Sequence, residues 1–336
     1  MKCMAPGTRE TTLKAGYPCG GKMNRKYFIT FLMVTIFVTT VFAEEEVFRL
    51  KSNPDKKRGV IAAPIFSLFL PGLDQYLEGQ YPYAFSYTGV ALAGSAFFVS
   101  ESNHHRSQRS HTPRDKHEKK EQDSAKSFNS YRKLGGKIYE TAGSFSAYHS
   151  FRTAVNSRRG DFSFLKHEET PSELLLAPLN FSFLARATTL LPLGVVIALS
   201  AFDLKNRDHK NRYTSIGDGI GITGGVSYMA GTGEEALFRG WLLPISHYYT
   251  NSAVWGNAIS SLLFGAAHYS SSNRFPLVQA VVGSYLGYVS QKNGYALAES
   301  IFIHTWWDVV ALGTLLLAKK KGEDVRVYTE LLNVPF

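Results

Sequence analysis

The apolar residues of this sequence gather in blocks and are not spread evenly along the chain. Each block contains roughly 17 to 23 residues, the length that an α-helix needs to cross the hydrocarbon core of a bilayer. The charged residues concentrate in the segments between the blocks. An apolar fraction of 44% over 336 residues is ordinary for a globular protein, so the arrangement carries the information. It predicts an all-α, polytopic transmembrane helix bundle.

The charge pattern argues for contact with lipid and against contact with nucleic acid. The net charge is +10, but the Lys and Arg residues flank the apolar blocks, and the sequence contains no nucleic-acid-binding motif. Anionic headgroups and the excess of positive charge in cytoplasmic loops explain this pattern. Cys3 and Cys19 both precede Met23, so they form neither a disulfide framework nor a zinc site in the body of the chain.

The N-terminus has the layout of a secretory signal peptide over residues 1–43, with Met23 as an alternative start. A basic stretch leads into an apolar run that ends with the small residues Val41 and Ala43 at the expected cleavage position. An uncleaved first transmembrane helix is the alternative. The layout points to a bacterial protein of the inner (cytoplasmic) membrane.

The rest of the chain divides into four segments. Residues 44–100 are expected to form a transmembrane hairpin with apolar runs at 60–77 and 84–100. Pro64, Pro71 and Gly72 are expected to interrupt the first run, which is then kinked or re-entrant. Residues 101–180 form a polar extramembrane segment that is expected to be disordered over 102–127. Within it, an amphipathic helix is expected to lie on the membrane or on the bundle, from the spacing of Ile138, Ala142, Phe145, Tyr148 and His149.

Residues 181–321 are expected to form the functional domain, and residues 322–336 a tail. The predicted spans of this domain are 183–202, 216–245, 253–269, 277–290 and 296–318, which gives about seven spans with the hairpin. The basic loop 205–212 and Lys319 to Lys321 are assigned to the cytoplasmic side, and the segment 101–180 to the opposite side.

Ionisable residues lie inside these apolar blocks. Each costs on the order of 3 kcal/mol at the centre of a bilayer, so a cluster of them indicates a functional site. They are Glu234, Glu235, Arg239, His268, Glu299, His304 and Asp308. Four-residue spacing places Glu235 with Arg239, and His304 with Asp308, on shared helix faces. Glu234 is rotated by about 100° from Glu235, so it can face the histidines.

Three motifs in this region resemble those of the CPBP family of intramembrane proteases, the CAAX-protease, bacteriocin-processing and Abi-like group. Gly233 to Gly240 is similar to its Glu-Glu-x-x-x-Arg motif, and Phe264 to His268 to its Phe-x-x-x-His motif. His304 to Asp308 is similar to its His-x-x-x-Asn motif. The resemblance covers roughly residues 183–319.

The resemblance implies an intramembrane endopeptidase that cleaves a membrane-associated protein or peptide without a cofactor. Glu234 and His268 would activate the attacking water, while His304 and Asp308 would orient groups or stabilise the oxyanion. Glu235 and Arg239 complete the predicted site.

Asp308 departs from the usual Asn, which can donate a hydrogen bond that an ionised Asp cannot. Three roles for Asp308 remain open: it is protonated in its apolar surroundings, it orients His304, or it helps to hold a metal. A zinc site formed by Glu234, His268, His304 and Asp308 is the alternative chemistry, although no His-Glu-x-x-His helix is present.

Two other function classes fit buried charges. One is a proton-coupled transporter, and the other is a non-catalytic membrane scaffold or immunity protein. No internal repeat of the kind found in transporters is visible in the sequence. In a bacterial chain, prenylated CAAX proteins are not the expected substrate.

Overall fold

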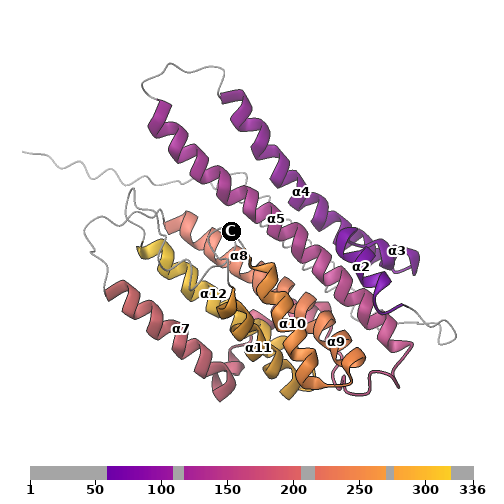
Figure 1. The fold of residues 1–336 in the computed structure, drawn as a ribbon. Helices are drawn as coiled ribbons and strands as arrows, with labels where there is room; N and C mark the ends of the chain where they lie inside the picture. The colour runs from indigo at the N-terminus through magenta and orange to yellow at the C-terminus, as the bar shows by residue number, and fades with distance from the viewer. Residues whose placement is uncertain (1–58, 109–116, 206–215, 270–275, 319–336) are drawn as a thin grey trace, which may run out of the picture.

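The computed structural model describes residues 59–108, 117–205, 216–269 and 276–318, and the elements in these ranges are helices (Figure 1). The N-terminal part contains α2 (Ala62–Phe69), α3 (Leu73–Leu77), α4 (Tyr81–Gln108) and α5 (His117–Asn156). The connection to the C-terminal part contains α6 (Pro171–Leu176) and the 3₁₀ helices η2 (Ala177–Leu179) and η3 (Phe181–Ala185). The C-terminal part contains α7 (Ala187–Lys205), α8 (Ile216–Leu237), the π-helical turn η4 (Phe238–Leu242), α9 (Leu243–Thr250), α10 (Ala253–Ala267), α11 (Leu277–Lys292) and α12 (Ala298–Ala318). The predicted all-α class is confirmed.

The helices α4 and α5 form a long antiparallel pair (Figure 1). They cross where Gly94 meets Gly135. A Cβ atom added to either glycine would lie 2.7 Å from the carbonyl oxygen of the other. Nearer to the start of α4, the hydroxyl of Tyr87 hydrogen-bonds to Nδ1 of His149 at 3.2 Å. Small residues at the crossing let the two backbones approach closely, and this fixes how α5 is presented to the rest of the bundle.

The helix α5 also lies against α8, and the two run in the same direction. The hydroxyl of Thr141 donates a 3.0 Å hydrogen bond to the carbonyl of Met229. Farther along both helices, Tyr148 lies against Gly240 in the π turn that follows α8. Because the residue numbers rise together along the contact, the N-terminal ends of α5 and α8 lie at the same end of the bundle (Figure 1).

The helix α12 lies antiparallel to α8 and parallel to α7. Thr305 packs against Gly231, while Ile301, earlier in α12, shares a core cluster with Ala236, later in α8. The first turn of α7 hydrogen-bonds to Glu299 in the first turn of α12. Consequently α4, α7 and α12 end at the same end of the bundle at which α5 and α8 begin.

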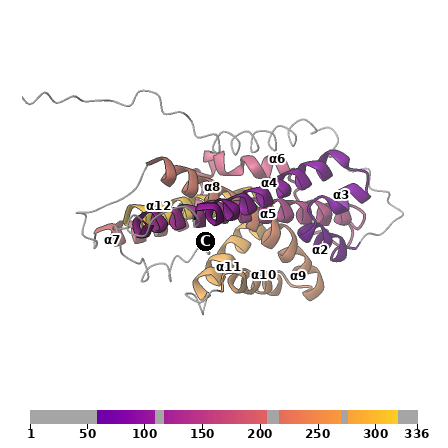
Figure 2. The same cartoon turned by 90° about the horizontal axis from the view of Figure 1, so that it is seen from above.

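A shared core joins the N-terminal helices to the C-terminal ones. One buried cluster draws its side chains from α4, α5, α6, α8 and α12: Tyr83, Tyr87, Phe145, Tyr148, Leu174, Leu175, Ala236, Leu297 and Ile301. A second cluster packs Phe151 of α5 against Trp241 of η4. Fully burying one large apolar side chain contributes about 1.5 to 3 kcal/mol. The N-terminal helices therefore belong to the same folded unit. In the view of Figure 2, α6 lies on one side of this unit and α10 and α11 on the other.

The predicted apolar helices of the C-terminal part are present with small changes at their ends. The long stretch 216–245 is divided by the π turn into α8, η4 and α9. The break expected near Pro71 falls between α2 and α3, where Gly72 adopts a φ of 92°. This left-handed conformation is one that glycine adopts without steric cost. Pro64, also expected to interrupt this run, lies in the first turn of α2, where a proline is tolerated. The break is therefore at Pro71 and Gly72 and not at Pro64.

Of the segment 102–127 that the sequence predicts to be disordered, residues 102–108 belong to α4 and 117–127 to α5. Lys, Glu, Gln and Ala in 117–127 favour helix even without an apolar face. Residues 102–108 lack these helix formers for the most part and continue a helix that is already packed, which extends at little cost. The predicted amphipathic helix lies on the bundle, and its marker residues Ile138, Ala142, Phe145, Tyr148 and His149 are all buried.

Several expectations fall outside the described residues. They are the signal peptide over 1–43, the two cysteines, the basic loop 205–212 beyond its first residue, Lys319 to Lys321 and the tail 322–336. Across the described ranges, no helix combines the length and the hydropathy that a membrane crossing requires.

Candidate active site

The six predicted site residues come together from three parts of the C-terminal half. Glu234 and Glu235 lie near the end of α8, and Arg239 lies one turn later in the π turn. His268 immediately follows α10, and α12 supplies His304 and Asp308. All six side chains are buried. A π turn inside an α-helix is often found at a functional site, and here it carries the buried arginine.

Glu235 and Arg239 form the ion pair that their spacing predicts. Their closest atoms, Oε1 and Nη1, are 3.0 Å apart, and the two side chains are 0% and 1% exposed. The guanidinium also donates to the carbonyl of Gly283 at 2.9 Å and lies 4.4 Å from the ring centroid of Phe264. Arg239 is therefore fixed by charge, by a hydrogen bond and by a cation–π contact.

Glu234 faces both histidines. Its Oε2 atom lies 3.7 Å from Nε2 of His268 and 3.8 Å from Nε2 of His304. His268 donates from Nδ1 to the carbonyl of Phe264 at 2.8 Å, which leaves its Nε2 as the basic nitrogen of the neutral ring. The Oε2 atom of Glu234 is buried and, among the described residues, has no hydrogen-bond partner.

His304 links the remaining carboxylates. Its Nδ1 donates to Oε1 of Glu235 at 2.9 Å, and its Nε2 lies 3.7 Å from Oδ2 of Asp308. An imidazole between carboxylates is stabilised in its protonated form by both neighbours. The predicted pairing of His304 with Asp308 on one helix face is thus present in the structure.

Lys137 of α5 also enters the cluster, and sequence reasoning missed it. Its Nζ lies 2.8 Å from Oε1 of Glu234 and 3.0 Å from Oε2 of Glu140, and its side chain is 13% exposed. Lys137 and Glu234 are 97 residues apart, so no spacing rule connects them. The segment 101–180 contains none of the six predicted site residues, and it supplies this cation.

The arrangement suits proton transfer by a carboxylate and a neutral imidazole. A buried Glu whose free oxygen is directed toward two imidazole nitrogens can take a proton from a water placed among them. The four residues predicted as a zinc set do not form a ligand cluster: within the described ranges, no group of three or more His, Cys, Asp and Glu side chains is arranged to hold a metal ion.

A narrow apolar groove of about 190 Å³ reaches His304 from the side of the bundle. Its walls come from α7, α11 and α12, and its lining residues include Leu191, Val195, Val281, Ile303 and Trp307. Several of these residues are exposed on the outer surface of the bundle. The groove therefore connects the outer apolar surface with one edge of the site.

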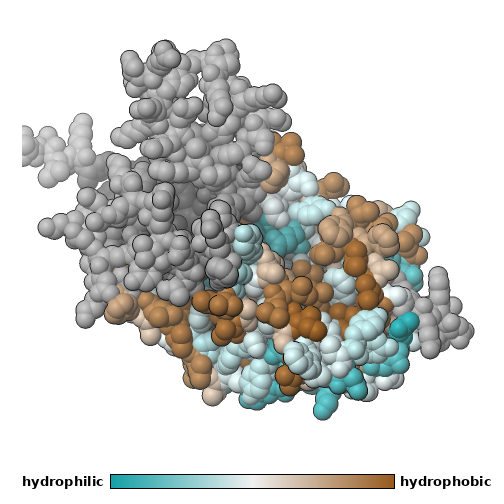
Figure 3. Space-filling model, in the orientation of Figure 1, coloured by the Kyte–Doolittle hydropathy of each residue, from teal (hydrophilic) through white to brown (hydrophobic). Residues whose placement is uncertain are grey.

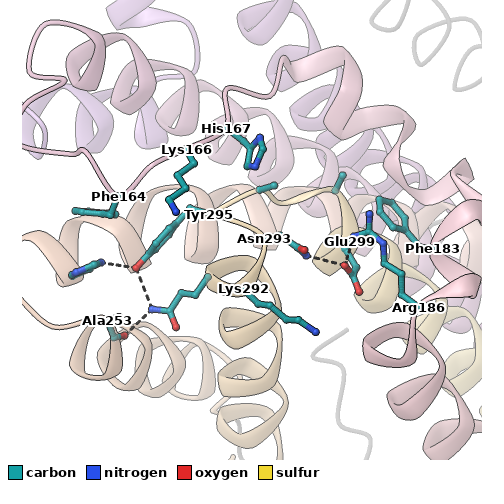
Figure 4. Close-up of a pocket in the computed structure, with 15 residues that line it drawn as sticks. Phe164, Lys166, His167, Phe183, Arg186, Ala253, Lys292, Asn293, Tyr295 and Glu299 are labelled. Carbon is teal, nitrogen blue, oxygen red and sulfur yellow. Dashed lines mark hydrogen bonds and ion pairs between the residues drawn. The ribbon is translucent and has the colours of Figure 1, made fainter.

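A larger cavity of about 730 Å³ lies elsewhere, where α11 ends and α12 begins (Figure 4). Glu299 lines it, and its carboxylate is bound by Arg186, Thr188, Thr189 and Asn293. These bonds tie the starts of α7 and α12 together. The cavity contains none of the six predicted site residues, so the Glu and His cluster remains the candidate active site.

Comparison with models of known protein families finds a match in the C-terminal half of the chain. The family model described as type II CAAX prenyl endopeptidase Rce1-like matches residues 219–310. This range contains all six predicted site residues and leaves α2 to α7 outside. No curated protein and no solved structure matches the chain.

Proposed function

We propose, from the membership of residues 219–310 in the type II CAAX prenyl endopeptidase Rce1-like family, that this protein is an intramembrane endopeptidase. In this proposal it cleaves a membrane-associated protein or peptide by attack of a water activated by Glu234 and His268. Membership in a peptidase family implies protein substrates. The single observation that carries the mechanism is the Oε2 atom of Glu234, buried within 3.8 Å of the Nε2 atoms of both histidines.

The proposed reaction uses each group for one task. A water bound between Glu234 and His268 attacks the scissile carbonyl carbon, and its proton passes to the Glu234 carboxylate. The oxyanion that forms is stabilised by the protonated imidazole of His304, which Glu235 and Asp308 flank. Glu234 then returns the proton to the amide nitrogen as the C–N bond breaks, which releases a neutral amine and a carboxylic acid. Transfer of the acid's proton to the amine gives the final carboxylate and ammonium.

A location in the cytoplasmic membrane of a bacterium is part of the proposal. Members of the family are membrane proteases. Figure 3 shows apolar side chains gathered across the face of the molecule that it presents. Exposed apolar residues are numerous on α7, α10 and α11, among them Leu190, Leu191, Ile197, Leu199, Phe202, Val254, Trp255, Leu262, Leu277 and Val281. An exposed apolar surface of this extent is expected to contact lipid.

The side groove supports entry of an apolar substrate segment from within the bilayer. It is lined by apolar surface and ends at His304. A substrate chain that reaches the site by this route can place an apolar side chain in the groove while its peptide bond approaches Glu234.

The test compares the membrane proteomes of cells that carry the wild-type chain or Glu234→Gln. The variant keeps the size of the side chain but cannot take up the proton, so uncut substrates should accumulate and their cleaved ends should disappear. Glu168→Gln is the matched control, because Glu168 is an exposed carboxylate paired with Arg159. The same cleavage should persist in chelators.

Processing that continues unchanged in the Glu234→Gln strain would exclude the peptidase mechanism. The transporter and scaffold interpretations would then remain. Loss of cleavage on chelation that added zinc restores would instead support the zinc set, with Asp308 as a ligand.

A further inference from the structure

The contact between Lys137 and Glu234 joins two parts of the chain that the family match separates. Lys137 lies on α5, outside residues 219–310, and Glu234 lies inside them. The Nζ to Oε1 distance is 2.8 Å, and both side chains are largely removed from solvent, at 13% and 6% exposure. A charge-assisted hydrogen bond of this length in a buried setting is strong and directional.

We propose that Lys137 is a positioning residue of the reaction: its ammonium holds Oε1 of Glu234 and leaves Oε2 directed at the two histidines. The inference deepens the proposed function and rests on it. Lys137 touches Glu234 and no reacting atom in the mechanism above, so it acts through the carboxylate that it holds.

The first argument comes from the two oxygens of Glu234. Lys137 occupies Oε1, while Oε2 is the atom that lies 3.7 and 3.8 Å from His268 and His304. A carboxylate with both oxygens unrestrained can rotate about its last torsion, which is a broad and soft one. Binding one oxygen to Lys137 fixes the other at the position where a water would give up its proton.

The second argument comes from charge. The groups that face Glu234 or Lys137 come from α5, α8, η4, α10 and α12, and they are Glu140, Glu235, Arg239, His268, His304 and Asp308. Among the buried members, Glu234, Glu235 and Asp308 are acidic. Arg239, Lys137 and a protonated His304 neutralise them, and His268 is neutral.

Asp308 gives this balance its particular form. The similar family motif has Asn at the position of Asp308. With Asn there, the buried acidic groups would be Glu234 and Glu235, and Arg239 with a protonated His304 would neutralise them. Asp308 adds a carboxylate 3.7 Å from His304, and Lys137 adds the cation that offsets it. Without Lys137 the buried cluster carries an unmatched negative charge, and Glu234, which loses its closest cation, is the group expected to take up a proton.

The experiment measures protonation of Glu234 directly and does not need a substrate. A hydrophobic carbodiimide reacts with protonated carboxyl groups in apolar surroundings, and mass spectrometry of the digested full chain locates the adduct. The wild-type chain in detergent micelles should label slowly at Glu234 at neutral pH. Lys137→Met should label at least about tenfold faster, the change that a tenfold rise in the protonated fraction produces.

Three variants separate positioning from simple damage to the fold. Lys137→Arg keeps the positive charge and should label as slowly as the wild type. The double variant Lys137→Met with Asp308→Asn removes one charge of each sign and should return labelling at Glu234 toward the wild-type rate. Glu140→Gln removes only the half-exposed partner of Lys137 and should change the rate little.

Equal labelling of Lys137→Met and the wild type would overturn the inference, as would equally fast labelling of the Arg and Met variants. The outcome is independent of the cleavage assay, so failure of the proposed function and failure of this inference can be told apart. In the proteomic assay, Lys137→Met should accumulate uncut substrate and Lys137→Arg should not.

Discussion

At the scale of single residues, two ion pairs of arginine with glutamate show how burial changes the effect of removing one charge on the stability of the fold. Arg239 and Glu235 are buried completely, with Gly283 and Phe264 as further partners of the guanidinium. Arg159 and Glu168 form a 2.9 Å ion pair with side chains that are 70% and 58% exposed. Removing one member of a buried pair leaves an uncompensated charge, whereas water replaces an exposed partner.

Arg239→Met should therefore lower the free energy of unfolding by about 3 to 5 kcal/mol. Arg159→Met should change it by less than about 1 kcal/mol. Thermal unfolding of the purified variants in the same detergent compares them. Similar midpoints for the two variants would mean that Glu235 does not depend on Arg239 for its charge.

The clustering of the six residues named from the sequence could be predicted because each motif is short and lies in a helix or runs just past its end. Spacing along a helix decides which side chains share a face, and this was sufficient for Glu235 with Arg239 and for His304 with Asp308. Lys137 could not be predicted in this way. Its partner lies on another helix 97 residues away, and only the packing of α5 on α8 brings them together.

At the scale of helices, neighbouring glycines in α5 have opposite surroundings. A Cβ atom on Gly135 would lie 2.7 Å from the carbonyl oxygen of Gly94 and 2.9 Å from the amide nitrogen of Phe98, whereas a Cβ on Gly136 would meet nothing within 4 Å. The backbone of α4 cannot move aside as a flexible side chain can. The close distance between α4 and α5 therefore depends on the glycine at position 135 and not on the one at position 136.

Gly135→Ala should destabilise the protein by about 1 kcal/mol or more, because the overpacked helices must separate. It should also reduce cleavage, since Lys137 lies half a turn away on the same helix. Gly136→Ala should be neutral or stabilise by up to about 1 kcal/mol, as alanine favours helix over glycine. Unfolding midpoints and cleavage rates measured together would test both parts, and equal behaviour of the two variants would contradict the close crossing.

The helix α7 offers a second matched pair of positions. Val195 lines the groove that ends at His304, while Ile197 is exposed on the same helix and is not part of the groove. Val195→Trp should fill the groove and lower kcat/KM by about tenfold or more, because the apolar subsite contributes about 1 to 3 kcal/mol. Ile197→Trp should leave kcat/KM unchanged. The substrates that accumulate with Glu234→Gln supply the assay, and a similar loss in both variants would exclude entry by this route.

Most helices could be predicted from apolar periodicity, but two features could not. The π turn from Phe238 to Leu242 lies against α5, α9 and α10, and the apolar pattern of the sequence does not distinguish it from a continuous α-helix. The charged ends of α4 and α5 have few apolar residues, so their composition predicts disorder. Composition shows how much apolar surface a segment can bury by itself. It does not show that the segment continues a helix whose other part is packed in the bundle.

At the scale of the whole molecule, the parallel course of α5 and α8 changes the expected topology. The ends of α4, α7 and α12 and the starts of α5 and α8 lie at the same end of the bundle (Figure 1). The sequence predicts residues 109–116 and 206–215 to lie on opposite sides of the membrane, whereas the described helices that precede and follow them end and begin at the same end of the bundle. With the bundle across a bilayer, as proposed, these helix ends face one side. The carboxylate of Glu169, which accepts hydrogen bonds from the backbone at the start of α12, lies toward the other side.

The basic residues in 109–116, in 206–215 and at Lys319 to Lys321 favour the cytoplasmic side for this end of the bundle by the positive-inside rule. In a chain with Cys3 and Cys19 replaced by Ser, single cysteines at Ser110 and Asn211 should label only from the cytoplasm. A cysteine at Ser163, which is exposed between α5 and α6, should label only from outside. Labelling of Ser110 and Asn211 from opposite sides would restore the original assignment and contradict the parallel pair.

The contact between Lys137 and Glu234 also sets an order for biosynthesis. A ribosome completes α5 well before α8, because 97 residues separate the two ends of the ion pair. During that interval the half-exposed Glu140 of the same helix is the carboxylate within reach of Lys137, and the buried partner Glu234 is still missing. Burying an ammonium without a buried counter-charge costs several kcal/mol. We therefore expect α5 to take its final place in the bundle only after α8 has been made.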